Sequence, residues 1–260
     1  MSPSPDQRLI EAIDSSIKLL VKFSIPLYLD DNDRPTPFGT GFFVQQQDDI
    51  FLVTAAHVLD KAQSHKLYYY TSPGDIRHIS GKMVRRTHDG DRRNDHIDIG
   101  VVKMSGGMLP PYPDINKYPM DISYLKPKHL PRSGKHYSFT GFPATKTKVR
   151  NCNKSIEVVA YSYRSDSIPE SEYTKYKVDA STHIVLPLDT KKGYDKNRNL
   201  THFPKPQGMS GSPVVALYEE GEADSIVFPV VGVAIEHRAR DNIVIATDVK
   251  YVLEAIHNAI

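Results

Sequence analysis

The sequence predicts an all-β fold in which two β-rich halves lie between an N-terminal and a C-terminal helix. Short apolar stretches rich in Val, Ile, Phe and Tyr alternate with polar turns, which is the pattern of strands in a barrel or sandwich. A segment rich in Pro, Gly and Tyr separates two sets of such strands. We therefore divide the chain into a helix at 1–21, a first half at 22–104, a connector at 105–135 and a second half with the terminal helix at 136–260.

Eleven apolar stretches are the expected strands. In the first half they cover residues 26–29, 39–44, 50–56, 66–70 and 98–103, and in the second half residues 136–143, 155–163, 183–188, 212–218, 228–235 and 242–247. Residues 190–207 are polar and predict a long loop, a kind of segment that often has a function.

Both terminal helices are predicted from apolar residues that recur every three or four positions. At the N-terminus Ser4 is a suitable cap, Pro5 suits the first helical position and Gln7 completes a capping box. We expect the apolar face of this helix to pack on the protein's own body, with docking on a partner as the alternative. The faces consist of Ile10, Ile13, Ile17 and Leu20 at the N-terminus, and of Val249, Val252, Leu253, Ile256 and Ile260 at the C-terminus.

Composition and charge exclude several classes of partner. The chain has 39% apolar and 25% charged residues, as in ordinary globular proteins, and a net charge of +2. A charge this small gives no general attraction to nucleic acid or to an anionic membrane, so we expect neither as a partner. The basic pairs, Arg85-Arg86, Arg92-Arg93 and Lys191-Lys192, are interpreted as solvated loop residues.

The single cysteine, Cys152, cannot form an internal disulfide. Secreted proteins of this size commonly contain several disulfides, so a single cysteine favours a reducing compartment. The N-terminal residues lack the basic and apolar regions of a secretory signal, and no apolar run approaches the roughly 20 residues that cross a bilayer. We expect a cytoplasmic protein, although a processed mature chain would have the same features.

The first segment with catalytic character is FLVTAAHVL, in which an apolar strand ends at His57. The small residues Ala55 and Ala56 allow the backbone to turn closely there and leave the imidazole exposed to a cleft. A histidine after a strand is more often structural when it is considered alone.

The second segment is DHIDIGVVK, which places Asp98 at the start of an apolar strand. A carboxylate in that position usually caps a turn or is solvated. Asp95 is a near competitor, and we prefer Asp98 because the apolar strand begins directly after it.

The third segment is QGMSGSP, in which Ser210 is flanked by Gly208 and Gly211. Glycines permit a tight turn whose backbone amides are free to point at a substrate oxygen, and the N–H groups of Gly208 and Ser210 can converge there. A turn without a catalytic role is the alternative.

Together the three segments resemble the conserved blocks of the chymotrypsin-like serine peptidases: TAAH, D-I-x-x-[VL] and G-x-S-G-[GS]-P. The similarity is greatest to bacterial branches such as the Deg/HtrA-type and glutamyl-endopeptidase-like enzymes, and it extends from Phe38 to the C-terminal helix. The order His57, Asp98, Ser210 is that of chymotrypsin, whereas subtilisins and α/β-hydrolases have other orders. The resemblance implies one trypsin-like domain over 1–260, with two six-stranded β-barrels.

The resemblance also implies the roles of these residues. Ser210 is the expected nucleophile, His57 its general base and Asp98 the carboxylate that orients the imidazole. The amides of Gly208 and Ser210 would form the oxyanion hole, without a metal or an organic cofactor. The predicted function is therefore a serine endopeptidase that acts on protein or peptide substrates through an acyl-enzyme.

The sequence departs from the family at Met209. Met209 occupies the position where secreted trypsin-like enzymes have an aspartate that pairs with a newly cut N-terminus, so that activation switch is not expected. The candidate control element is instead the loop at 190–207, ordered by itself or by an activating protein partner. The pocket for the residue before the scissile bond is expected near 204–207 and 235–237, with these candidates: Lys205, Gln207, Ile235, Glu236 and His237.

Two questions remain open from the sequence. Glu236 would favour a basic substrate side chain, whereas Lys205 with His237 would favour an acidic one. The alternative to an active enzyme is a latent or non-catalytic module of the same fold that binds a protein partner. Zinc, EF-hand and phosphate-loop chemistry are not predicted, because the chain lacks the motifs for them.

Overall fold

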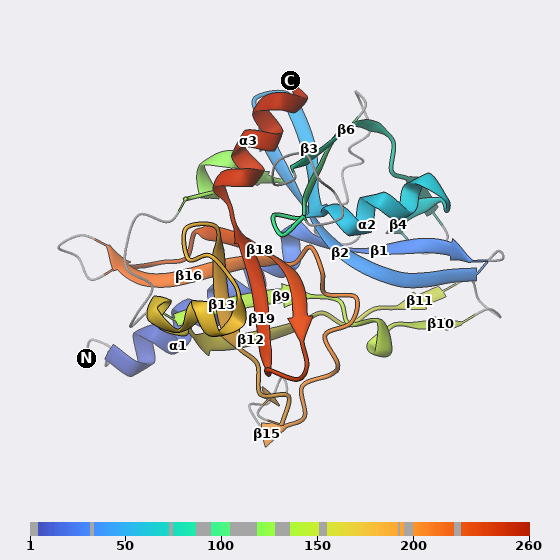
Figure 1. Cartoon of the computed structure of the whole chain (residues 1–260). Helices are drawn as coiled ribbons and strands as arrows, with labels where there is room; N and C mark the ends of the chain where they lie inside the picture. The colour runs from blue at the N-terminus through green and yellow to red at the C-terminus, as the bar shows by residue number, and fades with distance from the viewer. Residues whose placement is uncertain are drawn as a thin grey trace.

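The computed structural model describes residues 5–31, 34–72, 75–86, 95–104, 119–127, 136–150, 155–191, 193–194, 200–220 and 225–260. Within these residues the chain forms two curled antiparallel sheets with a helix at each end, which confirms the predicted fold class (Figure 1). The expected Ser4 cap, Arg92-Arg93 and Cys152 lie outside the described residues, as does most of the connector.

The first sheet contains eight strands in the order β5-β4-β1-β2-β3-β7-β6, with the short β8 parallel to β2. Antiparallel pairing of β2 with β3 and of β3 with β7 places the ends of β3 and β7 side by side. The strands are β1 (Ser24–Asp31), β2 (Arg34–Gln46), β3 (Asp49–Ala55), β4 (Leu67–Ser72), β5 (Asp75–His78), β6 (Gly81–Arg86), β7 (Ile99–Met104) and β8 (Met120–Asp121).

The second sheet has the order β12-β9-β16-β18-β19-β13, and β17 pairs with β16. Short strands of two to four residues, β5, β8 and β17, are thus added to the two expected sets of six. The strands are β9 (His136–Gly141), β12 (Tyr161–Asp166), β13 (His183–Pro187), β16 (Pro213–Glu220), β17 (Ser225–Val227), β18 (Val230–Arg238) and β19 (Ile243–Asp248).

Two small hairpins lie outside these sheets. One joins β10 (Lys148–Arg150) to β11 (Ser155–Glu157). The other joins β14 (Gly193–Tyr194) to β15 (Leu200–Thr201) within the predicted long loop. The ends of that loop are tied together, because the N–H of Phe203 donates to the carbonyl of Thr190 at 2.8 Å.

Each terminal helix packs on the sheet that is remote from it in sequence (Figure 1). The helix α1 (Pro5–Phe23) precedes the first sheet but contacts mainly β9, β16 and β17 of the second. The helix α3 (Lys250–Ala259) follows the second sheet but packs mainly on β6 and β7 of the first. The two halves are therefore held together by both helices as well as by their mutual contact.

The apolar face of α1 packs on the body of the protein as predicted, since Ile13 and Leu20 are buried. Burying one such side chain contributes about 1.5–3 kcal/mol. The prediction was wrong at the ends of the two faces. Ile10 remains 39% exposed one turn before the first buried contact, and Ile260 is 62% exposed because α3 ends at Ala259.

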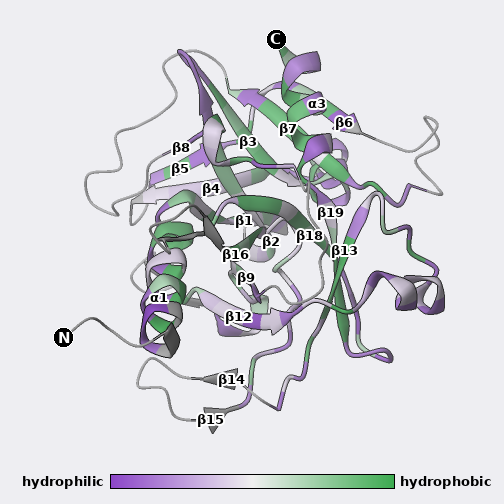
Figure 2. Ribbon diagram, turned by 90° about the vertical axis from the view of Figure 1, so that its left-hand side faces the viewer, coloured by the Kyte–Doolittle hydropathy of each residue, from purple (hydrophilic) through white to green (hydrophobic). Residues whose placement is uncertain are grey.

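The main hydrophobic core is shared by the two sheets. It combines buried side chains such as Leu27 and Val53 of the first sheet with Val215 and Val233 of the second. A smaller cluster lies within the second sheet, and hydrophobic stretches follow the central strands of both (Figure 2). No described helix is long and apolar enough to cross a membrane.

Candidate active site

His57 projects from the first sheet at the end of β3. The strand ends at Ala55, and the short helix α2 (Ala56–Asp60) begins at once, so His57 lies in its first turn. Ala55 and Ala56 are completely buried, and the N–H of Ala56 donates to the carbonyl of Asp98 at 2.8 Å. The small side chains predicted to permit this turn thus lie against the segment that carries the carboxylate.

Asp98 holds His57 through both of its carboxylate oxygens. The imidazole Nδ1 lies 2.5 Å from Oδ2, and the backbone N–H of His57 donates to Oδ1 at 2.8 Å. An ionised carboxylate only accepts hydrogen bonds, so Nδ1 carries the proton and Nε2 remains available as an acceptor. The carboxylate is nearly buried, whereas the imidazole side chain is 42% exposed and faces a cavity.

Asp95 does not compete for this position. Its Oδ1 accepts hydrogen bonds from the N–H groups of Ile97 and Asp98, at 3.0 and 3.1 Å. Asp95 thereby caps the tight turn that leads into β7, in which Asp98 has a φ of 49°. Asp residues tolerate this left-handed conformation better than most others. The structure therefore brings Asp98, and not Asp95, to His57.

Two polar residues of the second sheet hold this turn in place, and neither was predicted from the sequence. His183 Nε2 donates to the carbonyl of His96 at 2.6 Å, and the Thr247 hydroxyl donates to the carbonyl of Ile97 at 2.6 Å. Both residues are buried. They link the segment before Asp98 to the opposite half of the molecule.

Ser210 lies in a turn whose shape depends on glycines with positive φ. Gly208 has a φ of 91° and Gly211 a φ of 94°, a region that side chains disfavour. The N–H of Met209 donates to the carbonyl of Pro206 at 2.9 Å, which closes a four-residue turn around Gly208. The backbone amides of this turn are consequently fixed.

The orientation of the Gly208 amide follows from its neighbours. The carbonyl of Gln207 accepts the N–H of Ala144 at 2.8 Å. In a trans peptide the C=O and the following N–H point in opposite directions, so the N–H of Gly208 is directed away from Ala144. Within the described part of the chain, the N–H groups of Gly208 and Ser210 donate to no acceptor.

Thr40, on β2 of the first sheet, forms hydrogen bonds with the turn that contains Gly208 and Ser210. Its N–H donates to the carbonyl of Ser210 at 2.8 Å, and its hydroxyl donates to the carbonyl of Gly208 at 2.9 Å. The same hydroxyl accepts the N–H of Phe142 at 3.1 Å. Thr40 is completely buried, so these bonds are shielded from water. Sequence reasoning missed this residue, because a threonine inside a strand carries no signal of such contacts.

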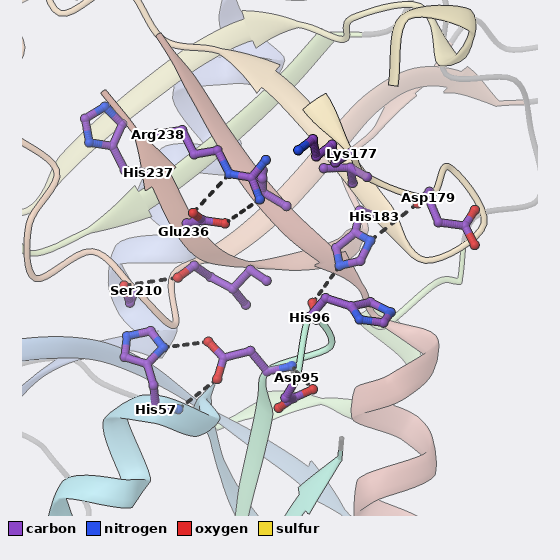
Figure 3. Close-up of a pocket in the computed structure, with 14 residues that line it drawn as sticks. His57, Asp95, His96, Lys177, Asp179, His183, Ser210, Glu236, His237 and Arg238 are labelled. Atoms are coloured by element: carbon purple, nitrogen blue, oxygen red, sulfur yellow. Dashed lines mark hydrogen bonds and ion pairs between the residues drawn. The ribbon is translucent and has the colours of Figure 1, made fainter. Parts of the chain in front are cut away.

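Ser210 and His57 line one cavity of about 680 Å³, together with Asp98 (Figure 3). The Ser210 hydroxyl donates to the carbonyl of Ile235 at 3.4 Å, and among the described residues no hydrogen bond joins it to His57. The nucleophile and the base predicted from the sequence therefore face the same space, with the hydroxyl turned towards β18.

A comparison with known protein families shows to which family this chain belongs. The family model described as "Trypsin-like peptidase domain" matches residues 39–223. This chain belongs to that family. No curated protein sequence matches it.

Solved structures agree with this trypsin-like peptidase domain in fold. One is neuropsin, a serine protease expressed in the limbic system of mouse brain, with a TM-score of 0.56 and 12% identity. The match covers 92% of this chain and 94% of neuropsin. Another, named GrC, gives a TM-score of 0.58 with 14% identity, covering 92% of this chain and 93% of that one. The arrangement of the two sheets is thus the chymotrypsin fold.

The residues expected to contact substrate divide into two groups. Ile235, Glu236 and His237 line the cavity beside Ser210, whereas Lys205 and Gln207 are exposed and line neither described cavity. Partial burial lowers the pKa of the His237 imidazole below its ordinary value.

The far part of the cavity is strongly polar. Glu236 forms an ion pair with Arg238, with oxygens 3.0 Å from both Nε and Nη2, and Arg238 also donates to the carbonyl of Tyr176. Lys177 and Asp179 lie opposite, on the loop that precedes β13 (Figure 3). Within the residues that the structure describes, no group of three His, Cys, Asp or Glu side chains could hold a metal ion.

Met209, at the position where the resemblance predicts no activation switch, has an apolar environment. Its side chain is buried in the apolar cluster of the second sheet, with Phe139 and Val214. A methionine there stabilises the turn by packing and needs no charged partner.

Proposed function

We propose that this trypsin-like domain is a serine endopeptidase that hydrolyses peptide bonds through Ser210, His57 and Asp98. The observation that carries the proposal is the pair of hydrogen bonds that His57 donates to the Asp98 carboxylate beside the turn of Ser210. It leaves Nε2 as a base on the side of the cavity that Ser210 lines. Proteins and peptides are the substrate class.

The reaction begins with a rotation of the Ser210 side chain about its Cα–Cβ bond, from Ile235 towards His57. Catalytic hydrogen bonds are often long or misaligned in the absence of substrate and tighten when substrate binds. His57 Nε2 then accepts the hydroxyl proton as Oγ bonds to the scissile carbonyl carbon. Asp98 stabilises the imidazolium that results.

The negative oxygen of the tetrahedral intermediate is then within reach of the N–H groups of Gly208 and Ser210. Collapse of the intermediate breaks the C–N bond, and His57 returns its proton to the leaving amine. Water then attacks the ester carbon of the acyl-enzyme while His57 accepts its proton. His57 returns that proton to Oγ as the ester C–O bond breaks, which restores the Ser210 hydroxyl. Each such amide donor typically contributes on the order of 3 kcal/mol to lowering the barrier.

The second candidate is a latent or non-catalytic module that binds a protein partner. One observation favours it, since the Ser210 hydroxyl is bonded to Ile235 at rest. In that case an activating partner would be needed to release the hydroxyl. The already ordered turn at Gly208 supports the active form instead.

Labelling with a fluorophosphonate probe tests the proposal, because the probe reacts with an activated serine by forming an O–P bond and expelling fluoride. We expect rapid labelling of the wild type and none of Ser210→Ala. Ser212→Ala is the matched control, since Ser212 lies in the same turn but is completely buried, and it should label like the wild type. A folded wild type that does not label would favour the latent module.

A further inference from the structure

Two hollows of very different size flank Ser210. The polar cavity lined by His57 has a volume of about 680 Å³, whereas the adjacent hollow, which shares Ser210, Glu236 and His237 with it, has about 20 Å³. Part of the wall of the smaller one is apolar and buried, since Phe139, Met209, Ala234 and Val244 are each 4% exposed or less.

The position of the small hollow indicates which substrate side chain would bind in it. It lies between the turn that begins at Pro206 and the strand segment of Glu236 and His237. These are the two segments in which the family resemblance places the side chain that precedes the scissile bond. A substrate whose carbonyl carbon is at Ser210 would therefore direct that side chain into the hollow.

The size of the hollow limits the side chain. A space of this volume has room for about one water molecule, which is comparable to a single methyl group. Its walls resist expansion because Val244 lies on β19, which is paired with β18 at His237 and with β13 at Leu186. Phe139 lies on β9, which is likewise paired on both sides.

Among the described residues that line the hollow, the one charged side chain is not available to recognise a long charged side chain of a substrate. Glu236 lines the hollow, but its carboxylate is held by Arg238 in a two-point ion pair. Lys205, the candidate for recognising an acidic side chain, does not line the hollow. His237 is partly buried, and the same burial that lowers its pKa favours the neutral imidazole. Neither the basic nor the acidic substrate preference considered from the sequence therefore has an unpaired charged partner among the described residues of this hollow.

We propose that the peptidase selects substrates with a small uncharged residue, Gly or Ala, directly before the scissile bond, and that Val244 sets this limit. The inference rests on the proposed peptidase function and specifies its substrate class. The large polar cavity then remains for the preceding substrate residues, where Lys177, Asp179 and the Glu236–Arg238 pair offer polar contacts.

The test uses a series of peptidyl diphenyl phosphonates with identical leading residues and with Ala, Phe, Lys or Glu at the position before the phosphorus. These reagents form an O–P bond to Ser210 and expel phenoxide, at a rate that depends on the fit of the side chain. We expect the Ala reagent to inactivate the wild type at least ~10-fold faster than the others, since a misfit of one or more methylene groups has this effect.

Variants at Val244 test whether this residue limits the size of the side chain that the hollow accepts. Val244→Gly, or Val244→Ala where the glycine variant is unstable, should raise the rate with the Phe reagent relative to Ala. Val231→Ala is the control, because Val231 belongs to the same apolar cluster but does not line the hollow. It should keep the wild-type ratio of rates.

Fluorophosphonate labelling separates the two possible failures, because that probe carries no side chain for the hollow. A wild type that labels but reacts equally with the Ala and Phe reagents would overturn the inference and leave the peptidase function intact. Such a result would mean that the flexible Met209 moves aside. A folded wild type that does not label would overturn the peptidase function and the inference with it.

Discussion

The two halves of the candidate site are built in different ways. The acid–base half comes from the first sheet and is a direct contact between side chains, with both Asp98 oxygens bonded to His57. The nucleophile half comes from the second sheet and consists mainly of backbone, in which Gly208 and Gly211 have positive φ. In this half the carbonyl groups of Gly208 and Ser210 accept hydrogen bonds from Thr40 of the first sheet. The carbonyl of Gln207 accepts one from the N–H of Ala144.

This difference has a consequence for mutation. The acid–base half depends on the chemical identity of two residues, so an isosteric change can abolish its function without disturbing the fold. The nucleophile half depends on conformation, so substitutions that alter backbone shape or its buried hydrogen bonds should impair stability and activity together. Three substitutions test this contrast, and we order them by the expected size of effect.

The largest effect is expected from Asp98→Asn. Asn retains an oxygen for the N–H of His57 and tolerates the left-handed φ, but it presents an amide N–H to Nδ1. The imidazole would then carry its proton on Nε2 and could not act as a base, which should lower kcat by about 10⁴-fold. Steady-state hydrolysis of a peptide with Ala before the scissile bond measures this, with thermal unfolding as the check on folding.

Asp95→Asn is the matched control for this change. Asp95 acts through one oxygen as the cap of the turn, and Asn offers the same acceptor. Its kcat should remain close to that of the wild type. Equal losses in the two variants would mean that the charge of the turn matters, and not the contact with His57.

The next effect is expected from Gly208→Ala. An added Cβ would lie 2.9 Å from the backbone N of Ala144 and 3.0 Å from the carbonyl oxygen of Phe142, at a φ that side chains disfavour. The turn must shift to relieve these contacts, which misdirects an oxyanion donor and should lower kcat by about 10²–10³-fold. Unlike Asp98→Asn, this variant should also have a lower melting temperature. Unchanged stability with a loss of activity would contradict the conformational account.

The sequence was sufficient for those parts of the molecule that depend on local pattern. Apolar stretches between polar turns predicted most of the strands, although β6 was missed and the stretch at 155–163 divides into β11 and β12. The three segments around His57, Asp98 and Ser210 predicted residues that the fold brings to one cavity. Their roles in catalysis stay predictions until activity is measured. The departure at Met209 was also visible, since a residue type alone signals the missing charge.

Features that join distant segments could not be predicted. The crossed packing of α1 and α3 depends on tertiary contacts, because an apolar helical face does not specify which sheet it covers. Thr40, His183 and Thr247 donate to backbone carbonyls that are 87 to 168 positions away in the sequence, and backbone acceptors have no sequence signature. The narrow hollow beside Ser210 likewise arises from strands β9 and β19 meeting the turn.

The smallest of the three effects is expected from Thr40→Val, which preserves shape but removes the hydroxyl. The carbonyl of Gly208 and the N–H of Phe142 would lose a buried partner, at a cost of about 1–3 kcal/mol in the free energy of unfolding. A looser Gly208 turn should also lower kcat, though less than Gly208→Ala does. Thr40→Ser retains the hydroxyl and should recover most of both losses. Urea unfolding and peptide hydrolysis measure the two quantities, and equal behaviour of the Val and Ser variants would show that the Thr40 hydroxyl does not position the turn of the nucleophile.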